Sequence, residues 1–407
     1  MLESADTFLA RTTVLGGSLV LRKAWAVLAT AAVFLAFTAG TAAAFTPSPG
    51  PLFNNPRGSK TAKARIIHNI IAAINATPRH STIRIAAYSF DRPDVGDALV
   101  AAHNRDVDVQ MVLNDNWTST QTLRLRRNLG TDPNRRSFVV ICKAACRGGA
   151  GNQHMKFYLF SRSGAAKDVT MIGSANLTGF GAFVQWNDMF TIVNNFAVRD
   201  LYTTIFEQLV RDIRVGKPYL NATAGGFETH FYPHPNTTAG NDPEMRRLKQ
   251  VHCTATGGTG RNGHTIVRIV MYGWNQARGL YLADEVADLD RAGCDVRVLL
   301  SDGGARVYRH LKAGGVRVKS ADLDLNDNPN DGFEESGYEL FTHEKYMLLS
   351  GGYGNSSSTY QVWTGSENWS SLAMINDEVT IRIPRESAYT GYLANFDYIW
   401  KNWSRWL

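Results

Sequence analysis

The sequence of 407 residues predicts an α/β protein built from two similar halves, each with a mixed sheet between layers of helices. Three observations support this prediction. Apolar runs rich in β-branched residues, suited to buried strands, alternate with helical stretches. The same succession of strand, helix and strand occurs twice along the chain. A segment rich in Gly, Pro, Asn and Thr, near 216–241, separates the two copies.

The first copy opens with the strand-like run TIRIAAYSFD, a helical stretch through DALVAAHNR, and the strand-like run DVDVQMVLND. Four more strand-like runs follow, namely SFVVICK, HMKFYLF, VTMIGSANLT and DMFTIVNN. An amphipathic helix over about 197–214 closes this copy. We therefore assign residues 45–218 to the first repeat.

The second copy repeats this order with TIVRIVMYGW, a helix through LYLADEVADLDRAG, and CDVRVLLSD. Its later strands are VRVKSADL, HEKYMLLS, YQVWTGSENWS and EVTIRIPR, and its closing helix covers about 388–403. Residues 219–407 are thus assigned to the second repeat. Two similar halves in one chain are expected to pack about a pseudo-twofold axis, where equivalent residues meet.

Residues 1–44 are predicted to be a signal peptide. Arg22 and Lys23 precede an apolar run that ends near Phe37, and the small residues at 42–44 fit the cleavage rule. The mature chain would then begin near Phe45, and the protein would be secreted to the extracellular space. An uncleaved membrane anchor is the alternative, although the apolar run is short for a membrane span.

Cleavage there leaves 40 basic and 34 acidic residues, a formal charge of +6. This modest basic excess suits an anionic substrate, but it does not distinguish nucleic acid from a lipid headgroup.

The four cysteines of the mature chain favour disulfides, because their number is even and the chain is expected to be exported. Three connectivities are available, of which we expect the local one, Cys142 with Cys146 and Cys253 with Cys294. No CxxC or His–Cys spacing indicates a metal site.

Each copy carries an HxK motif, which a GSxN motif follows 20 or 23 residues later. The residues concerned are His154, Lys156, Ser174 and Asn176 in the first copy and His343, Lys345, Ser366 and Asn368 in the second. Side chains at i and i+2 of a strand point to the same face. If the two strands pair, an imidazole, an ammonium, a hydroxyl and an amide therefore converge, and two such sets can face one phosphate.

This combination suits phosphodiester cleavage. One histidine can attack phosphorus and form a phosphohistidine, while the other protonates the leaving oxygen and then activates water. The lysines and asparagine amides stabilise the charge, and the serines are expected to bind substrate, so neither a metal nor another cofactor is expected. Asp188 and Glu378, about a dozen residues beyond each GSxN, are the candidates to orient the histidines.

At these motifs the sequence resembles the phospholipase D superfamily, whose pattern is HxKxxxxD followed by GSxN. The resemblance implies the phospholipase D fold, with His154 as the nucleophile and His343 as the general acid and base. Ser161 and Ser350 stand where the pattern has Asp. That Asp is understood to support the architecture, and the tyrosyl-DNA phosphodiesterases of the family lack it while keeping His, Lys and Asn.

The leading hypothesis is a secreted phospholipase D-type enzyme that hydrolyses phospholipids at a membrane surface, without an obligate protein partner. A metal-independent extracellular nuclease or related nucleic-acid phosphodiesterase is the alternative, and a non-catalytic anion-binding module is a third hypothesis. A lipid enzyme should show an apolar rim with exposed aromatic side chains around the histidines. A nuclease should show a basic groove that runs past them.

Overall fold

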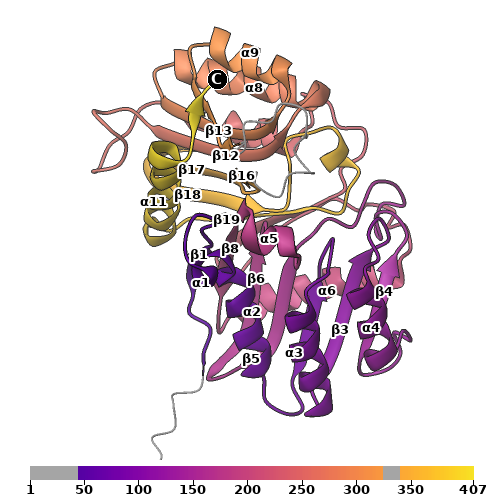
Figure 1. The fold of residues 1–407 in the computed structure, drawn as a ribbon. Coiled ribbons are helices and arrows are strands. Elements are labelled where there is room, and N and C mark those ends of the chain that lie inside the picture. Colours follow the sequence, from indigo (N-terminus) through magenta and orange to yellow (C-terminus); the bar gives the residue numbers. More distant parts are fainter. Residues whose placement is uncertain (1–44, 324–339) are drawn as a thin grey trace, which may run out of the picture. The chain divides into compact units, whose positions relative to one another are not determined.

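The computed structural model describes residues 45–323 and 340–407, so the predicted signal peptide lies outside the described residues. Within these ranges the chain forms two large mixed sheets and one small sheet (Figure 1). No helix in these ranges has the length and hydropathy of a membrane span.

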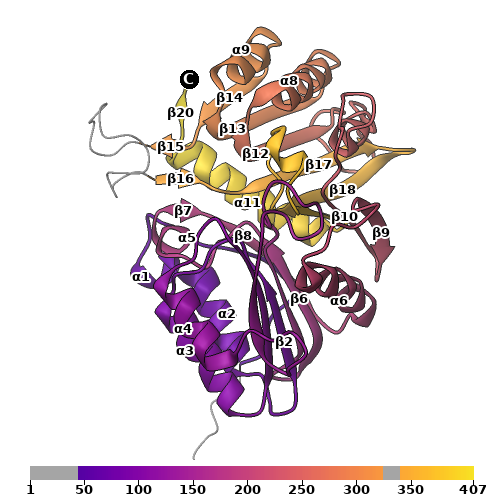
Figure 2. The same ribbon diagram turned by 90° about the vertical axis from the view of Figure 1, so that its right-hand side faces the viewer.

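The first large sheet has seven strands in the order β1-β8-β6-β5-β2-β3-β4. Only the β2–β3 and β3–β4 pairs are parallel. The strands are β1 (Gly50–Phe53), β2 (Thr82–Ala86), β3 (Asp108–Asn114), β4 (Phe138–Cys142), β5 (Phe157–Ser163), β6 (Ala166–Gly173) and β8 (Asp188–Ile192). Figure 2 shows α2, α3 and α4 on one face of this sheet and α6 on the other. The helices are α1 (Lys60–Lys63), α2 (Arg65–Asn75), α3 (Pro93–Asn104), α4 (Thr120–Leu129), α5 (Gly179–Phe183) and α6 (Phe196–Arg211).

The second large sheet has the order β20-β14-β13-β12-β17-β18-β19-β10-β9, and β11 pairs with β17. Its strands are β9 (Leu220–Ala224), β10 (Phe227–Phe231), β11 (Val251–His252), β12 (Ile266–Trp274), β13 (Asp295–Gly303), β14 (Arg317–Ser320), β17 (Lys345–Tyr353), β18 (Ser356–Gly365), β19 (Val379–Ile383) and β20 (Arg405–Trp406). Its helices are α7 (Pro243–Leu248), α8 (Gln276–Arg291), α9 (Ala305–Ala313), the 3₁₀ helix η1 (Leu372–Met374) and α11 (Glu386–Asn402).

The two large sheets share one plan. The run β8-β6-β5-β2-β3-β4 of the first corresponds to β19-β18-β17-β12-β13-β14 of the second. The strand directions agree as well, since β12, β13 and β14 are parallel and the pairs from β12 to β19 are antiparallel. The expected α/β class and the duplicated mixed sheet are thus confirmed.

A shared core and a small sheet join the halves. The small sheet pairs β7 (Gln185–Trp186) of the first half in parallel with β16 (Leu340–Thr342), and β15 (Asp322–Leu323) completes it. One hydrophobic cluster includes Tyr202 of α6, Tyr392 of α11 and the fully buried Trp186. Because this cluster draws on both large sheets, the motif strands of the two halves are held against each other.

The segment 216–241 between the two copies contains regular secondary structure. Within 216–241, β9 and β10 form a hairpin that extends the second sheet beyond β19. Gly225 and Gly226 make the turn, with φ angles of 53° and 85°. A two-residue turn with positive φ at both positions favours Gly-Gly, so this hairpin had a signal in the sequence.

Candidate active site

The two HxK and GSxN motifs lie at equivalent ends of paired strands. Lys156 immediately precedes β5 and Lys345 begins β17, while Gly173 and Gly365 end the neighbouring strands β6 and β18. A Cβ atom on Gly173 would lie 2.1 Å from the carbonyl oxygen of Asp188, and one on Gly365 would lie 2.0 Å from that of Val379. Only glycine permits this approach, which brings the next strand of each half against its GSxN motif.

Each histidine hydrogen-bonds a side chain from the opposite half. Nδ1 of His154 lies 2.9 Å from a carboxylate oxygen of the fully buried Glu378. Nδ1 of His343 lies 3.1 Å from Oδ1 of Asn187, which is also fully buried. Such a bond fixes the ring orientation and leaves Nε2 for chemistry. The two acceptors differ, since one is a carboxylate and the other a neutral amide.

Asp188, the acceptor predicted for the first half, does not take this role. Its carboxylate instead accepts hydrogen bonds from the hydroxyls of Thr364 and Tyr392, the latter at 2.8 Å. The amide of Ser174 donates to the carbonyl of Asp188, as that of Ser366 does to Val379. Asp188 is therefore the counterpart of Val379, and Asn187 is the counterpart of Glu378.

The motif serines hold these acceptors, which corrects the expectation that they bind substrate. Oγ of Ser174 donates to Oδ1 of Asn187 at 3.0 Å, and Oγ of Ser366 donates to the carboxylate of Glu378 at 2.5 Å. Each hydroxyl also accepts a backbone N–H, from Asp188 and Val379 respectively. Both serines are fully buried, so they position the groups that orient the histidines.

Each motif lysine binds the main chain of the histidine in its own half, and Asn368 binds the main chain next to Tyr272. Nζ of Lys156 donates to the carbonyl of His154 at 2.7 Å, and Lys345 makes the same bond to His343. Oδ1 of Asn368 accepts the backbone N–H of Gly273 at 3.2 Å. The amide group of that side chain is then the part suited to an anion.

Two tyrosines that the motif analysis missed complete the site. The ring of Tyr88 lies 4.9 Å from that of His154, and the ring of Tyr272 lies 4.7 Å from that of His343. Each ring also faces the lysine of its own half, at 5.4 Å and 4.7 Å from Nζ. Cation–π contacts of this kind help to hold the ammonium groups. Their signal was present, because a tyrosine occupies the same place in TIRIAAYSFD and TIVRIVMYGW.

Burial and mutual repulsion shift the titration of the basic groups. Burial lowers the pKa of His343 well below its ordinary value, and Lys345, Lys156 and His154 lower it further. Burial also lowers the pKa of His154, against the opposing effect of Glu378. Burial lowers the pKa of Lys156 to about 7 and that of Lys345 well below its ordinary value. Groups from both halves thus act on one another, and a bound anion would relieve their repulsion.

Ser161 and Ser350, at the Asp positions of the family pattern, bind the main chain. The hydroxyl of Ser161 accepts the backbone N–H of Thr82, and that of Ser350 accepts the backbone N–H of Gly260, each at 2.9 Å. Each bond joins the strand that carries the serine to the main chain of another segment. Both serines therefore support the fold.

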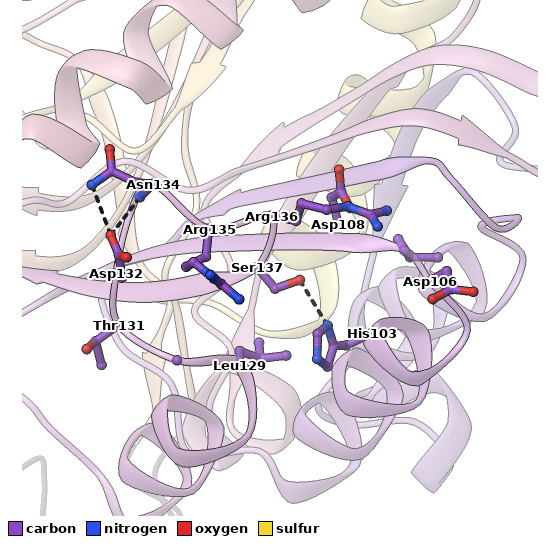
Figure 3. Close-up of a pocket in the computed structure, with 12 residues that line it drawn as sticks. His103, Asp106, Asp108, Leu129, Thr131, Asp132, Asn134, Arg135, Arg136 and Ser137 are labelled. Atoms are coloured by element: carbon purple, nitrogen blue, oxygen red, sulfur yellow. Dashed lines mark hydrogen bonds and ion pairs between the residues drawn. The ribbon is translucent and has the colours of Figure 1, made fainter.

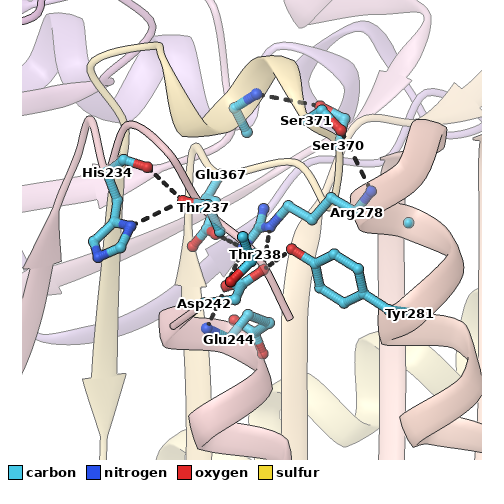
Figure 4. A network of polar contacts seen from close by, with 12 residues as sticks. His234, Thr237, Thr238, Asp242, Glu244, Arg278, Tyr281, Glu367, Ser370 and Ser371 are labelled. Carbon is cyan, nitrogen blue, oxygen red and sulfur yellow. Dashed lines mark hydrogen bonds and ion pairs between the residues drawn. The ribbon is translucent and has the colours of Figure 1, made fainter. Parts of the chain in front are cut away.

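A buried ionic network supports the second GSxN motif (Figure 4). Arg278 of α8 binds the carboxylate of Asp242 at 2.7 Å and that of Glu367 at 2.6 Å. Its third contact is the carbonyl oxygen of Asn368, at 2.9 Å. This arginine therefore holds the backbone from which the Asn368 amide projects, and sequence spacing alone gave no indication of it.

The disulfide Cys142–Cys146 is connected to His154 through the residue that follows it and Asp377. The next residue, Arg147, donates its backbone N–H to the carboxylate of Asp377 at 3.3 Å. The carbonyl of Asp377 in turn accepts the backbone N–H of His154 at 2.9 Å. The second disulfide, Cys253–Cys294, joins the segment before β12 to the start of β13.

A separate hollow of about 590 Å³ lies at the other end of the first sheet (Figure 3). Asp108 and Ser137, at the starts of β3 and β4, are among its lining residues. The opposite end of β3 leads to Asn116, whose amide contacts Asn152 beside the first HxK motif. The hollow is therefore remote from the paired histidines.

Comparisons with known proteins agree with this geometry. Residues 70–210 match the family model described as "Cardiolipin synthase, PLD-like domain". Phosphatidylserine synthase from Haemophilus influenzae Rd KW20 is similar in structure, with a TM-score of 0.57 and 11% identity over 88% of this chain and 90% of that one. Polyphosphate kinase from Porphyromonas gingivalis gives a TM-score of 0.51 with 12% identity. This similarity covers 87% of the present chain and 51% of the kinase, so the chain spans about half the kinase's length. No curated protein sequence matches.

Proposed function

Because residues 70–210 match a PLD-like domain and both halves carry the HxK and GSxN motifs, we propose that the chain belongs to the phospholipase D superfamily and is a phosphodiesterase that hydrolyses phospholipids through a phosphohistidine intermediate. The observation that carries this proposal is that each motif histidine is held at Nδ1 by a buried side chain of the other half. Two lysines and two asparagines beside them supply positive charge and hydrogen-bond donors for the phosphate oxygens.

In the first step Nε2 of His154 attacks phosphorus. The bound phosphate anion opposes the charges that lower the pKa of His343, so that His343 enters this step protonated at both nitrogens. A P–N bond forms while the P–O bond to the headgroup alcohol breaks, and His343 gives its Nε2 proton to the departing oxygen. The imidazole of His154 gains positive charge, which the Glu378 carboxylate at Nδ1 stabilises. The neutral Asn187 gives His343 no such stabilisation, which favours release of its proton.

In the second step water replaces the histidine. Nε2 of His343 removes a proton from the water as its oxygen attacks phosphorus, and the P–N bond to His154 breaks. The products are phosphatidate and the free headgroup alcohol, and both histidines return to their initial states. Lys156 and Lys345 donate hydrogen bonds to the phosphate oxygens and, when protonated, balance their charge, so the scheme includes no metal ion or other cofactor.

We also propose that the protein is secreted and acts without an obligate protein partner. The two disulfides support this, because such bonds persist in oxidising compartments.

A nucleic-acid phosphodiesterase is the second candidate, and the charge distribution favours it. Residues 45–218 contain 22 basic and 12 acidic residues, a net +10, whereas 219–407 contain 18 and 22, a net −4. A basic half can attract the phosphates of a nucleic acid as well as an anionic bilayer.

One assay tests the proposal. The purified mature chain, with EDTA present, is offered phosphatidylcholine vesicles and, separately, single- and double-stranded DNA. We expect release of choline and phosphatidate at a rate that EDTA does not change. Cleavage of DNA without choline release would establish the second candidate. Loss of turnover in EDTA, restored by calcium or magnesium, would contradict the mechanism.

A further inference from the structure

We propose that two short apolar turns beside the histidines dock the protein onto an anionic phospholipid bilayer. The turns are α5 in the first half and η1 in the second. Their exposed side chains, Phe180, Phe183, Leu372 and Ile375, are called the apolar rim below. This inference rests on the phosphodiesterase function proposed above and adds the surface through which the active site reaches its substrate.

The apolar rim is duplicated along with the catalytic motif. Phe180 and Phe183 lie four and seven residues after Asn176, and Leu372 and Ile375 lie four and seven residues after Asn368. The first member of each pair is 45% exposed and the second 37%. A single exposed hydrophobic side chain needs no explanation, but a matched set at one site indicates an interaction surface.

Each turn is bonded to the group that orients a histidine. In α5, the carbonyl of Gly181 accepts a hydrogen bond from the Asn187 amide at 3.1 Å, and Asn187 holds His343. After η1, the amide of Asn376 donates to the Glu378 carboxylate at 3.0 Å, and Glu378 holds His154. Each half of the apolar rim is therefore joined to a histidine by a path of two hydrogen bonds.

A third exposed aromatic residue extends this surface. Trp117, 42% exposed, lies in the connection between β3 and α4. The neighbouring Asn116 donates its amide to Oδ1 of Asn152, whose backbone N–H donates to Oδ1 of Asn376. The Trp117 connection is thus joined to the end of η1.

The chemistry of the apolar rim fits a lipid surface. Leucine and isoleucine cannot stack on bases, whereas single-stranded nucleic acid is held by aromatic platforms and basic grooves. Arg92, which also pairs with the carboxylate of Asp94, lies 5.1 Å from the ring of Phe183, so charged groups border the apolar side chain, as in segments that rest in the headgroup region. The net +10 of residues 45–218 complements an anionic bilayer.

The test separates binding from turnover. Vesicles of phosphatidylcholine and phosphatidylglycerol in equal parts are floated with His154→Ala protein, so that no lipid is consumed. Adding Phe180→Ser with Leu372→Ser, or all four rim substitutions to serine, should weaken binding by about tenfold or more. Phe196→Ser is the matched control, because Phe196 is 60% exposed at the start of α6, beyond the far end of β8, and should leave binding unchanged.

Turnover of the water-soluble diester bis(p-nitrophenyl) phosphate is measured with His154 intact. The rim variants should keep it, which shows that they fold and that their active site is intact. Vesicle binding that is unaffected by the rim substitutions, or weakened equally by Phe196→Ser, would overturn the inference. So would a loss of single-stranded DNA binding in place of vesicle binding. Failure of the proposed function has a different signature, namely an unsubstituted chain that cleaves neither the soluble diester nor the lipid.

Discussion

His154 of the first half donates a hydrogen bond to Glu378 of the second, over 2.9 Å, whereas His343 binds the amide oxygen of Asn187. The two halves are alike in strand order, yet their histidines are chemically unequal. A buried carboxylate stabilises a positively charged imidazole ring, and a neutral amide does so far less. This difference gives a physical reason for assigning nucleophilic attack to His154.

We predict that the covalent intermediate forms on His154. In His343→Ala, an aryl phosphodiester with a good leaving group should still react, because its departure needs little protonation. Attack by water would be slow without its base, so the adduct should accumulate. Rapid-quench mass spectrometry at alkaline pH, where P–N bonds survive, measures it. An adduct on His343 in His154→Ala protein, with none in the other variant, would reverse the assignment.

Glu378→Gln should lower kcat by about four orders of magnitude, the loss that follows when the carboxylate orienting a catalytic histidine becomes an amide, and move the acidic limb of the pH profile to lower pH. Burial alone would raise the pKa of Glu378, but His154 holds it below its ordinary value, so Glu378 is ionised and raises the pKa of His154 in return. Without the carboxylate the pKa of His154 falls, and the ring stays unprotonated to lower pH. Asp188→Asn is the control, because it alters a buried carboxylate that binds Thr364 and Tyr392 and does not bind His154. This variant should leave the acidic limb of the pH profile unchanged.

Anion binding should weaken as the pH rises through about 7. Burial lowers the pKa of Lys156 to about 7, so its ammonium carries a charge below that pH and loses it above. Sulfate is a suitable probe, because its own charge is constant over this range. Calorimetry should give a dissociation constant that rises with pH in the unsubstituted chain. Lys156→Met should bind sulfate about tenfold more weakly at pH 6 and lose the pH dependence near 7. The same pH dependence in both proteins would rule out Lys156 as its source.

Arg278→Met should destabilise the fold by about 3–5 kcal/mol, because it leaves the carboxylates of Asp242 and Glu367 buried without their partner. Urea unfolding measures this change. Arg291→Met in the same helix is the control, since its ion pair with Asp288 is exposed and should contribute within about 0.5 kcal/mol. Equal stability of the two variants would mean that water reaches the Arg278 network.

The strands, the repeat and the motif residues could be predicted because each depends on local pattern. Apolar β-branched runs marked the sheets, and the HxK and GSxN patterns marked the motif residues. His154 and Lys156 precede β5, so the expected spacing of two along a strand was wrong, and the bond from Nζ of Lys156 to the carbonyl of His154 joins them instead. The residue-by-residue correspondence between the two halves after the GSxN motifs could not be obtained in this way. Eleven residues separate Asn176 from Asn187, but ten separate Asn368 from Glu378, so a comparison by residue type matched Glu378 with Asp188. Only the backbone bonds of Ser174 and Ser366 give the true correspondence.

Other parts of the site depend on contacts between distant segments. Arg278 lies 90 residues before Asn368, and no pattern in α8 marks it as the residue that holds that backbone. The expectation for Ser174 and Ser366 failed for a related reason. A hydroxyl in a motif suggests substrate contact, but whether it faces substrate or a buried acceptor depends on how the next strand packs.

The disulfide between Cys142 and Cys146 closes a five-residue loop, and such a bond persists only in an oxidising environment. Arg147 follows this loop, binds Asp377, and is anchored by its guanidinium to the carbonyls of Tyr232 and Pro218. In a reducing cytoplasm the loop is open, and the backbone that seats His154 loses one of its fixed ends. If the proposed secretion and phospholipid hydrolysis hold, His154 would be held less firmly in a chain still inside the reducing cytoplasm than in the exported one.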